Sequence, residues 1–420
     1  MFTPQLARRD FCKVALTMPL AAQAKVNFSS TAQQKYLYFG RDEDYKEFKI
    51  IEEGLEIVKV EKFTKPKEGV VRIQTDDGSE GYGQISPHDA EFSAIILHNK
   101  IAKHFLGEDP AHIDELVDHC IDSNYKFPWT FVCRALTGLD TAIWDLYGKI
   151  KRKPVVELLG GQVRPIAAYG SSMRRDISPE EEASRMVALR DSKGFTAFKL
   201  RVGKVTGHDK DQWPGRSEKL IPTVRKALGD NIDLMADANS CYTPPKAIAL
   251  GRIMEDNNCF FFEEPCPYWE LEWTAEVAKN VNVAVAGGEQ DNDLAQWRRM
   301  INMNAVDIAQ PDVCYIGGLT RALRVARMAH KAGKLCIPHS SNVSMVSVFT
   351  LHMLGAIPNS KYIEFTIDGT SELARESQAM YEPQLTVVDG KVMIPNGPGW
   401  GVTFKKEWLE SAKYQKSEEK

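Results

Sequence analysis

Acidic residues recur at a regular interval in the second half of the sequence. Asp237, Glu263 and Glu289 lie 26 residues apart, and each follows a short apolar run. If these runs are neighbouring parallel strands, the three carboxylates meet at one edge of the sheet. Crowded carboxylates repel one another, so some would take up protons unless a cation lies among them. Because carboxylate oxygens with room for water are what Mg²⁺ prefers, the spacing predicts a magnesium site.

A carboxylate and a histidine end the next two apolar runs, VDIAQPD and LCIPHS. A single histidine in such a place is more often structural. A carboxylate bonded to one imidazole nitrogen fixes the tautomer and raises the basicity of the other nitrogen. With Asp312 beside His339 and a metal site opposite, the pattern predicts His339 as a general base.

Two cations end an earlier apolar run, FTAFKLR. Side chains alternate along a strand, so Lys199 and Arg201 are expected on one face and Phe198, Leu200 and Val202 on the other. An arginine with a pKa above about 12 is a poor base and a good clamp. The pair is therefore expected to bind an anion.

The elements that must position these residues are short strands alternating with helical segments. Eight strands are expected, at residues 166–171, 195–202, 232–239, 259–265, 283–289, 306–312, 335–340 and 362–365. This rhythm predicts an α/β fold, a (β/α)8 TIM-type barrel with its active site at the carboxyl ends of the strands. The alternative, a doubly wound open sheet, would usually carry a GxGxxG turn after its first strand, and AAYGSSMRR is not one.

The residues before the barrel predict a smaller α+β domain. Alternating runs joined by DDG indicate a β hairpin, and the helical pattern that follows is strongest in CRALTGLDTAIWDLYGK. We expect an N-terminal capping domain at residues 48–150 and the barrel at 164–385. Residues 386–420 are expected to return to the capping domain.

The composition is that of an ordinary globular protein. Of 420 residues, 43% are hydrophobic and 26% charged, and the formal net charge is -4. This charge, without any sustained basic block, predicts small-molecule partners and no nucleic acid. No apolar run is long enough for a membrane span. The eight cysteines form no CxxC pair and are expected to be buried free thiols.

The first 25 residues resemble a twin-arginine export leader. Arg8 and Arg9 precede a short apolar stretch and then small residues at Ala22 and Ala24. This pattern predicts export of the folded protein, as in a periplasmic enzyme. The alternative is an N-terminal helix with a chance arginine pair, which would leave the protein cytoplasmic.

The motifs together resemble the mandelate racemase branch of the enolase superfamily from about residue 48 to 408. The strings that carry the resemblance are DAN, FFEEP, GGE, QPDVCYIGG, IPHSS, IEF, LTGLDTAIWDLYGK and PVVELLGG. The resemblance implies a carboxylate substrate bound to Mg²⁺, loss of the proton α to the carboxylate, and an enediolate. It implies Asp237, Glu263 and Glu289 as metal ligands and His339 with Asp312 as the base dyad. It also implies that Glu364 hydrogen-bonds the enediolate oxygen as the protonated acid.

One position departs from the family's commonest pattern, which is Lys-x-Lys where this chain has Lys199 and Arg201. The second lysine would be a base on the face opposite His339, so its replacement favours a one-base reaction. We therefore expect an acid-sugar dehydratase that eliminates the β hydroxyl to give a 2-keto-3-deoxy acid. Lys199 and Arg201 clamp its carboxylate, and Asn239 is expected to reach its hydroxyls or carboxylate.

Two alternatives remain. Lys199 could itself be the opposite base, which would make the protein a racemase, epimerase or cycloisomerase. A non-catalytic binding protein would be expected to lack a member of the metal triad or dyad, and none is missing. His88, His208 and Trp213 lie in loops that could shape specificity, although such residues are more often on the surface. The resemblance also implies a homo-oligomer.

Overall fold

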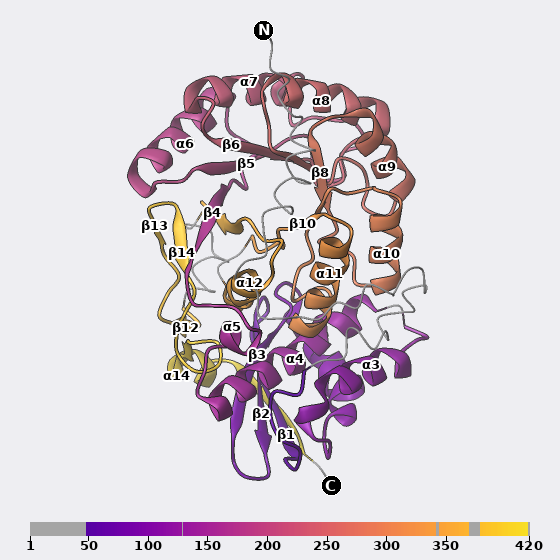
Figure 1. The fold of residues 1–420 in the computed structure, drawn as a ribbon, viewed down its shortest axis with the longest axis vertical. Coiled ribbons are helices and arrows are strands. Elements are labelled where there is room, and N and C mark those ends of the chain that lie inside the picture. The colour runs from indigo at the N-terminus through magenta and orange to yellow at the C-terminus, as the bar shows by residue number, and fades with distance from the viewer. Residues whose placement is uncertain (1–47, 128, 342–343, 369–378, 419–420) are drawn as a thin grey trace.

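Eight parallel strands form the barrel at the centre of the computed structural model, which describes residues 48–127, 129–341, 344–368 and 379–418 (Figure 1). The leader expected at residues 1–25 lies outside these ranges. The strands are β4 (Pro165–Ser171), β5 (Ala197–Arg201), β6 (Asp233–Asp237), β7 (Phe261–Glu263), β8 (Ala284–Gly287), β9 (Ile308–Ala309), β10 (Leu335–Cys336) and β11 (Ile363–Thr366). Each overlaps an expected strand, and the predicted barrel is confirmed.

The sheet closes because β11 returns to the first strand. Strands β4 to β10 pair in chain order, and β11 pairs with β4 on its other side. Individual hydrogen bonds connect the β10 and β11 segments. In one of them, Ser340 Oγ, just after β10, donates to the Glu364 carbonyl of β11 at 3.1 Å. The ends of all eight strands therefore face one mouth.

Helices cover the outside of the barrel (Figure 1). They are α6 (Pro179–Lys193), α7 (Arg216–Leu228), α8 (Pro244–Asp256), α9 (Leu271–Asn280), α10 (Leu294–Asn302), α11 (Leu319–Lys331) and α12 (Met345–Ala356). Phe198, Leu200 and Val202 belong to the core between the strands and these helices, whereas Ala197 packs among the residues that fill the barrel. The predicted alternation along β5 is therefore confirmed.

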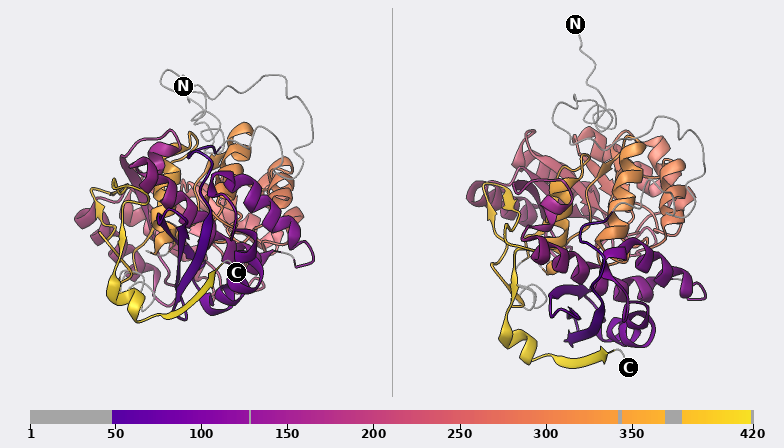
Figure 2. Two further views of the ribbon diagram at one scale, coloured as in Figure 1. Left: turned by 90° about the horizontal axis from the view of Figure 1, so that it is seen from below. Right: turned by 60° about the horizontal axis from the view of Figure 1, so that its bottom comes forward.

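The capping domain is a four-stranded antiparallel sheet with helices on it. Its strands are β1 (Ile57–Thr64), β2 (Gly69–Thr75), β3 (Glu80–Ile85) and β16 (Lys413–Glu418), and its main helices are α2 (Ala90–Ile96), α3 (Ile113–Ser123) and α4 (Thr130–Lys151). Figure 2 shows β16, from the far end of the chain, beside β1. The edge of β1 is therefore covered.

Short elements link the two domains. They are the helices α5 (Val155–Leu158) and α14 (Lys406–Glu410) and the strands β12 (Tyr381–Glu382), β13 (Val387–Val388), β14 (Lys391–Met393) and β15 (Thr403–Phe404). Within the cap, helical turns at Leu97–Ile101, Ala102–His104 and Pro110–His112 connect α2 with α3. Strand β14 pairs antiparallel with β4 of the barrel before β16 reaches the cap. Residues 386–418 therefore contact both domains.

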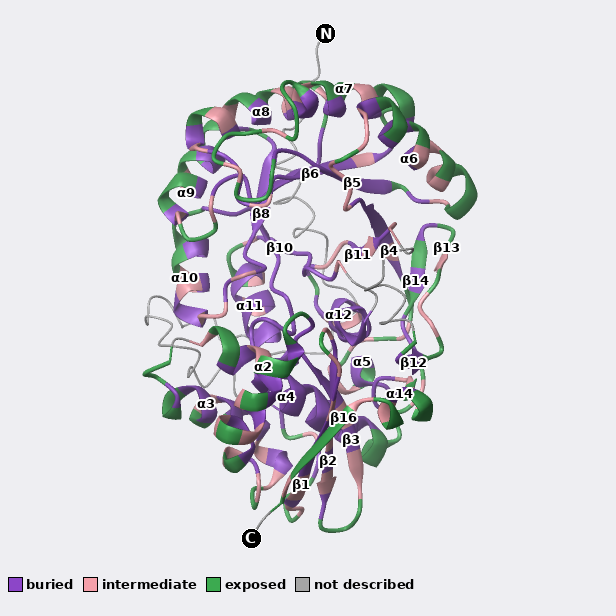
Figure 3. Cartoon of the chain, turned by 180° about the vertical axis from the view of Figure 1, so that it is seen from behind, coloured by how far each residue is buried: buried purple, intermediate pink, exposed green. Residues whose placement is uncertain are grey.

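Helix α4 holds the cap on the barrel, and Figure 3 shows it as one of the most completely buried helices. Asp140 accepts a hydrogen bond of 2.6 Å from the Leu319 backbone N–H, at the N-terminus of α11. Trp144 Nε1 donates to Thr320 Oγ1 at 3.1 Å. Gly318 precedes α11 at φ +116°, and a Cβ there would lie 2.2 Å from Asp140. This contact therefore requires glycine at position 318.

Two expectations from composition can be compared with the described residues. The seven cysteines among them are all buried and free. Within the same ranges, no helix combines the length and the apolar character needed to cross a membrane.

A buried ion pair also joins the domains. Arg324 of α11, 1% exposed, donates to Asp114 Oδ1 at 2.7 Å and to Asp118 Oδ1 at 2.6 Å, both on α3. The variant Arg324→Met leaves Asp114 buried without its counter-ion. We expect the free energy of unfolding to fall by about 3–5 kcal/mol, as measured by urea denaturation.

The matched control is Glu53→Gln, which breaks the exposed pair between Lys49 and Glu53. Exposed pairs contribute little, so its urea midpoint should equal that of the wild type. A midpoint for Arg324→Met no lower than that of the control would contradict a stabilising role for the inter-domain pair.

Candidate active site

The strand register brings the predicted site residues together at the mouth of the barrel. Arg201 at the end of β5 is the neighbour of Asp237 on β6, and Asp237 is the neighbour of Glu263 on β7. Glu289 follows two residues after the end of β8. All four side chains are buried or nearly so. Parallel pairing therefore makes one layer of residues that are far apart in sequence.

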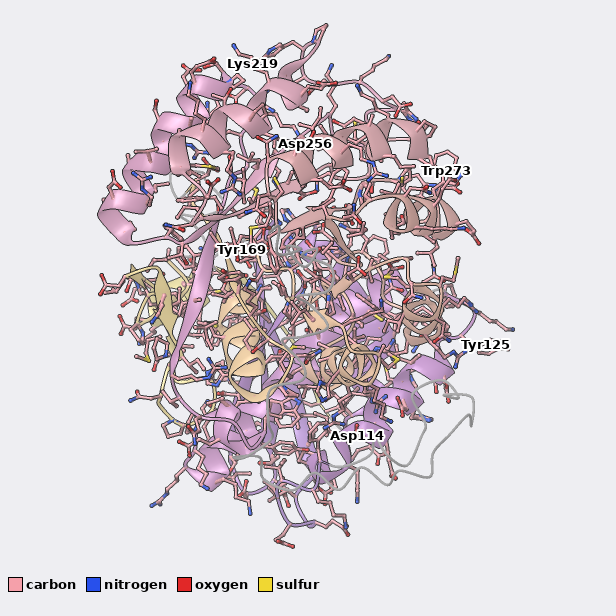
Figure 4. All side chains as sticks on the ribbon, turned by 45° about the horizontal axis from the view of Figure 1, so that its top comes forward. Asp114, Tyr125, Tyr169, Lys219, Asp256 and Trp273 are labelled. Atoms are coloured by element: carbon pink, nitrogen blue, oxygen red, sulfur yellow. The ribbon has the colours of Figure 1, made fainter. Side chains whose placement is uncertain are left out.

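Lys199 is fully buried between two carboxylates. Its Nζ lies 2.8 Å from Glu263 Oε2, 2.7 Å from Glu364 Oε1 and 3.8 Å from Asp237 Oδ2. The ring of Tyr169, labelled in Figure 4, lies 5.3 Å from the same nitrogen. Burial by itself lowers the pKa of Lys199. The negative charges of Glu263 and Glu364 outweigh burial and raise this pKa to well above its ordinary value. Lys199 is therefore held as the ammonium ion.

The guanidinium of Arg201 also donates hydrogen bonds to neighbouring residues of the protein. Its Nη1 donates to Asp237 Oδ2 and, at 2.9 Å, to Asn239 Oδ1, while Nε donates to the Ser172 carbonyl at 2.8 Å. Asn239 has a left-handed backbone (φ +43°) that turns its amide back toward these groups. Its oxygen thus accepts from Arg201, and the expectation that Asn239 reaches the hydroxyls or carboxylate of the substrate stays a prediction.

A second arginine, which sequence reasoning missed, reaches the same place. Arg175 Nη2 donates to Asn239 Oδ1 at 2.5 Å, and its Nε donates to the Gly203 carbonyl at 2.9 Å. Arg175 follows β4, where the MRR triplet after the first barrel strand was the available signal. The positive charge at this side of the mouth is therefore larger than the Lys199 and Arg201 pair alone.

The structure forms the predicted dyad. His339 Nδ1 lies 2.7 Å from Asp312 Oδ2, and Asp312 Oδ1 accepts from the backbone N–H groups of Cys314 at 2.7 Å and Tyr315 at 3.0 Å. His339 Nε2 lies 3.3 Å from Glu289 Oε2. Burial lowers the pKa of His339, but Glu289 and Asp312 raise it to about 10 overall. Asp312 thus binds the imidazole at Nδ1, and Nε2 is the ring nitrogen that faces the other residues of the site.

Glu364 lies among hydrogen-bond donors. Ser171 Oγ donates to it at 2.7 Å, the Ser340 N–H donates at 3.0 Å, and Lys199 lies against it. Burial raises the pKa of Glu364, but Lys199, followed by His339 and Arg201, lowers it to below its ordinary value. These contacts favour the carboxylate, and the protonated acid expected during the reaction stays a prediction.

The carboxylates outnumber the cations that reach them. Glu263 accepts from Gln310 Nε2 at 2.8 Å, yet burial and the neighbouring acids raise its pKa to about 7 against the effect of Lys199. The buried Oε1 of Glu264 has no hydrogen-bond partner. Among the described residues, no three His, Cys, Asp or Glu side chains already converge on a point that could hold a metal ion. The donors are nevertheless the hard oxygens that suit Mg²⁺, and their charge is incompletely balanced.

The capping domain contributes Arg134, which the sequence analysis also missed. Its guanidinium lies 3.7 Å from the ring centre of Tyr315, and that ring lies 5.8 Å from the ring of His339. Arg134 Nη1 donates to Ser86 Oγ at 2.6 Å. Tyr315 falls within the QPDVCYIGG motif, but no sequence signal indicates which cap residue meets it.

The three loop residues suggested for specificity have different surroundings. Burial, followed by the charges of Arg134 and His339, lowers the pKa of His88. His208 is exposed. Trp213 is partly exposed, and Arg216 lies 5.3 Å from its ring centre. Of the three, His88 has the clearest connection with the site.

Two family models match the sequence. The model described as "Mandelate racemase / muconate lactonizing enzyme, N-terminal domain" matches residues 57–160, and the model described as "Enolase C-terminal domain-like" matches residues 181–408. The arabinonate dehydratase of Saccharolobus solfataricus is 28% identical, over 81% of this chain and 89% of that protein. The D-galactarolactone cycloisomerase of Agrobacterium fabrum is 29% identical, over 83% of this chain and 92% of that protein.

Solved structures agree with these matches. A protein of Roseobacter denitrificans, provisionally named a racemase, superposes with a TM-score of 0.85 and 47% identity, covering 86% of this chain and all 100% of that one. A mandelate racemase/muconate lactonizing protein of Paracoccus denitrificans, complexed with magnesium, superposes with a TM-score of 0.78 and 25% identity, covering 87% and 100%.

The contact between Asp312 and His339 predicts a measurable shift in pKa. Because the Asp312 carboxylate raises the pKa of His339 from its ordinary value, Asp312→Asn should lower that pKa. NMR titration of histidine-labelled protein measures it, with the His339 signal assigned by its loss in His339→Asn.

The control is Asp233→Asn, which removes a carboxylate at the start of β6, where it binds Lys361 and Tyr362. The His339 titration should be unchanged in that variant. An unchanged titration in Asp312→Asn as well would show that Asp312 does not stabilise the imidazolium.

Proposed function

The chain belongs to the mandelate racemase/muconate lactonizing enzyme family of the enolase superfamily, and on that premise we propose that it is a Mg²⁺-dependent acid-sugar dehydratase. In this proposal it removes the proton α to a carboxylate and eliminates the β hydroxyl as water. The product is a 2-keto-3-deoxy acid. The proposal is carried by the ion pairs of Lys199 and Arg201. Both cations contact protein carboxylates, which leaves His339 as the one proposed general base.

Lys199 and Arg201 are the two groups that could have provided a second base. Lys199 is held protonated by Glu263 and Glu364, and a guanidinium does not deprotonate near neutral pH. Racemisation by proton transfer on both faces needs a base on each. The charges around these two residues therefore favour a one-base reaction.

His339 performs both proton transfers in the proposed mechanism. In its neutral form, His339 accepts the α proton at Nε2 while Asp312 holds Nδ1 and stabilises the imidazolium. Glu289, which contributes most to raising the pKa of His339, is a proposed Mg²⁺ ligand, so a bound metal ion would favour this neutral form. The same nitrogen then donates this proton to the β hydroxyl, the carbon–oxygen bond breaks, and water leaves. The resulting enol tautomerises to the keto acid. The substrate carboxylate would share Lys199 and Arg201 with their protein carboxylates, and the two cations would stabilise the negative charge that develops on it.

Asp237, Glu263 and Glu289 are the proposed ligands of Mg²⁺. Support comes from their oxygen donors, their incompletely balanced charge, and the magnesium complex of the Paracoccus structure. When bound, Mg²⁺ supplies Lewis-acid stabilisation of charge on the substrate carboxylate. Glu263 is shared with Lys199, so the same carboxylate connects the metal position and the carboxylate clamp.

Isomerisation by the same enolisation is the second candidate. It is supported by the cycloisomerase relative and by the racemase name of the Roseobacter structure. In this alternative, Lys199 releases Glu364 and acts as the base opposite His339. Exchange of the α proton with solvent, without loss of water, distinguishes it from dehydration.

The dehydratase proposal predicts a specific product. Purified protein with Mg²⁺, screened against aldonic and aldaric acids, should form a 2-keto-3-deoxy acid from at least one of them. His339→Asn should abolish product, and EDTA should do so reversibly. Absence of keto acid from every substrate would overturn dehydration, and α-proton exchange in D2O would then favour the isomerase.

We also propose that residues 1–25 are a twin-arginine export leader. The full-length chain, expressed in a bacterium with an active twin-arginine pathway, should be found in the periplasm. Replacing both Arg8 and Arg9 with lysine should retain it in the cytoplasm, because the arginine pair is what the export receptor reads. Equal periplasmic fractions for the two chains would contradict the proposal.

A further inference from the structure

Arg134 is a cation near the proposed base that forms no ion pair with the residues the structure describes. Its guanidinium stacks on the neutral ring of Tyr315 and donates to the neutral hydroxyl of Ser86. In the described part of the chain, no Asp or Glu lies within ion-pair distance of it. Lys199 and Arg201, in contrast, each contact at least one carboxylate. The charge of Arg134 is thus available to an anion from outside.

The position of Arg134 gives the site two positive ends. A path of contacts runs from Lys199 to Glu364 (2.7 Å), from Glu364 to His339 (4.0 Å), from His339 to Tyr315 (5.8 Å between rings) and from Tyr315 to Arg134 (3.7 Å). The base therefore lies between a cation in the barrel and a cation on the cap.

A six-carbon diacid carries a carboxylate at each end of its chain, as a site with two positive ends requires. Five carbon–carbon bonds of about 1.5 Å, in a zigzag, span about 6 Å. A hydrogen bond of about 3 Å at each end extends the reach to about 12 Å. Such an acid connects two cations that lie within this reach of each other. One carboxylate would bind at Lys199 and Arg201 while the other meets Arg134.

The side chain itself is suited to a carboxylate. Nη1 donates to Ser86, and the guanidinium also hydrogen-bonds the side chain of Tyr315, which leaves the remaining N–H groups of the fork for a carboxylate. Tyr315 restricts the plane of the guanidinium by stacking, which reduces the entropy lost on binding. A group needed only to tie Ser86 to Tyr315 could be neutral.

We propose that Arg134 binds the distal carboxylate of the substrate, which is therefore an aldaric acid, a sugar chain with a carboxylate at both ends. This inference rests on the dehydratase proposed above and specifies its substrate class. It assigns to helix α4 of the capping domain a direct contact with the substrate.

The test compares each aldarate with the aldonate of the same configuration, which carries a hydroxymethyl group in place of the distal carboxylate. Wild-type protein should prefer the aldarate. In Arg134→Gln, kcat/KM for the aldarate should fall about 10- to 100-fold, because a hydrogen bond to a charged group is lost, while kcat/KM for the aldonate stays the same. Arg134→Lys should keep an intermediate preference, because it retains the charge without the fork.

Arg252→Gln, an exposed arginine on α8, is the control and should change neither value. If Arg134→Gln lowers kcat/KM equally for both acids, the dehydratase proposal stands and Arg134 only positions Tyr315 and the dyad. If the Gln variant does not fold, the Lys variant decides, because an unchanged preference there overturns the assignment.

Failure of the proposed function gives a separate result. If the wild type turns over neither acid, titration calorimetry with galactarate still tests Arg134. Weaker binding of galactarate to Arg134→Gln, with unchanged binding of galactonate, would support the distal contact. Equal affinities of the variant and the wild type for galactarate would overturn it.

Discussion

Burial of many carboxylates at one barrel mouth is the constraint on which the rest of the site depends. Asp237, Glu263, Glu264, Glu289, Asp312 and Glu364 are all buried there. Each ionised group needs a cation or donors, because an isolated buried charge is far less stable than a solvated one. The pairing of Lys199 and Arg201 with these acids satisfies part of that need. The same pairing is the basis for proposing His339 as the single base.

The capping domain is part of this electrostatic arrangement as well as a cover. Helix α4 carries Asp140 and Trp144, which contact α11, and, one to three turns earlier, Arg134, which stacks on Tyr315. Tyr315 in turn donates its backbone N–H to Asp312. Docking of the cap and orientation of the dyad therefore rely on the same helix. A shift of α4 would change the position of Tyr315 and, through Asp312, the orientation of His339.

The barrel and its inward-facing residues could be predicted because strand alternation and strand ends are local properties of the sequence. Lys199 with Arg201, and Asp312 with His339, were found in this way. Arg134 and Arg175 were not, because their positions depend on how a separate domain and a loop meet the barrel. The contact of Glu364 with Lys199, at 2.7 Å, and the left-handed turn at Asn239 could not be read from the sequence, because both depend on the packing of neighbouring strand ends.

The pairing of β16 with β1 has a consequence for biosynthesis. Residues 57–64 leave the ribosome early, whereas their partner, residues 413–418, is made some 350 residues later. Until then β1 has an open edge, which is a template for pairing with another chain. The cap sheet cannot be completed during most of translation, and closing so long a loop slows folding. A nascent chain of this protein therefore carries an unfinished sheet that must be kept from neighbouring chains.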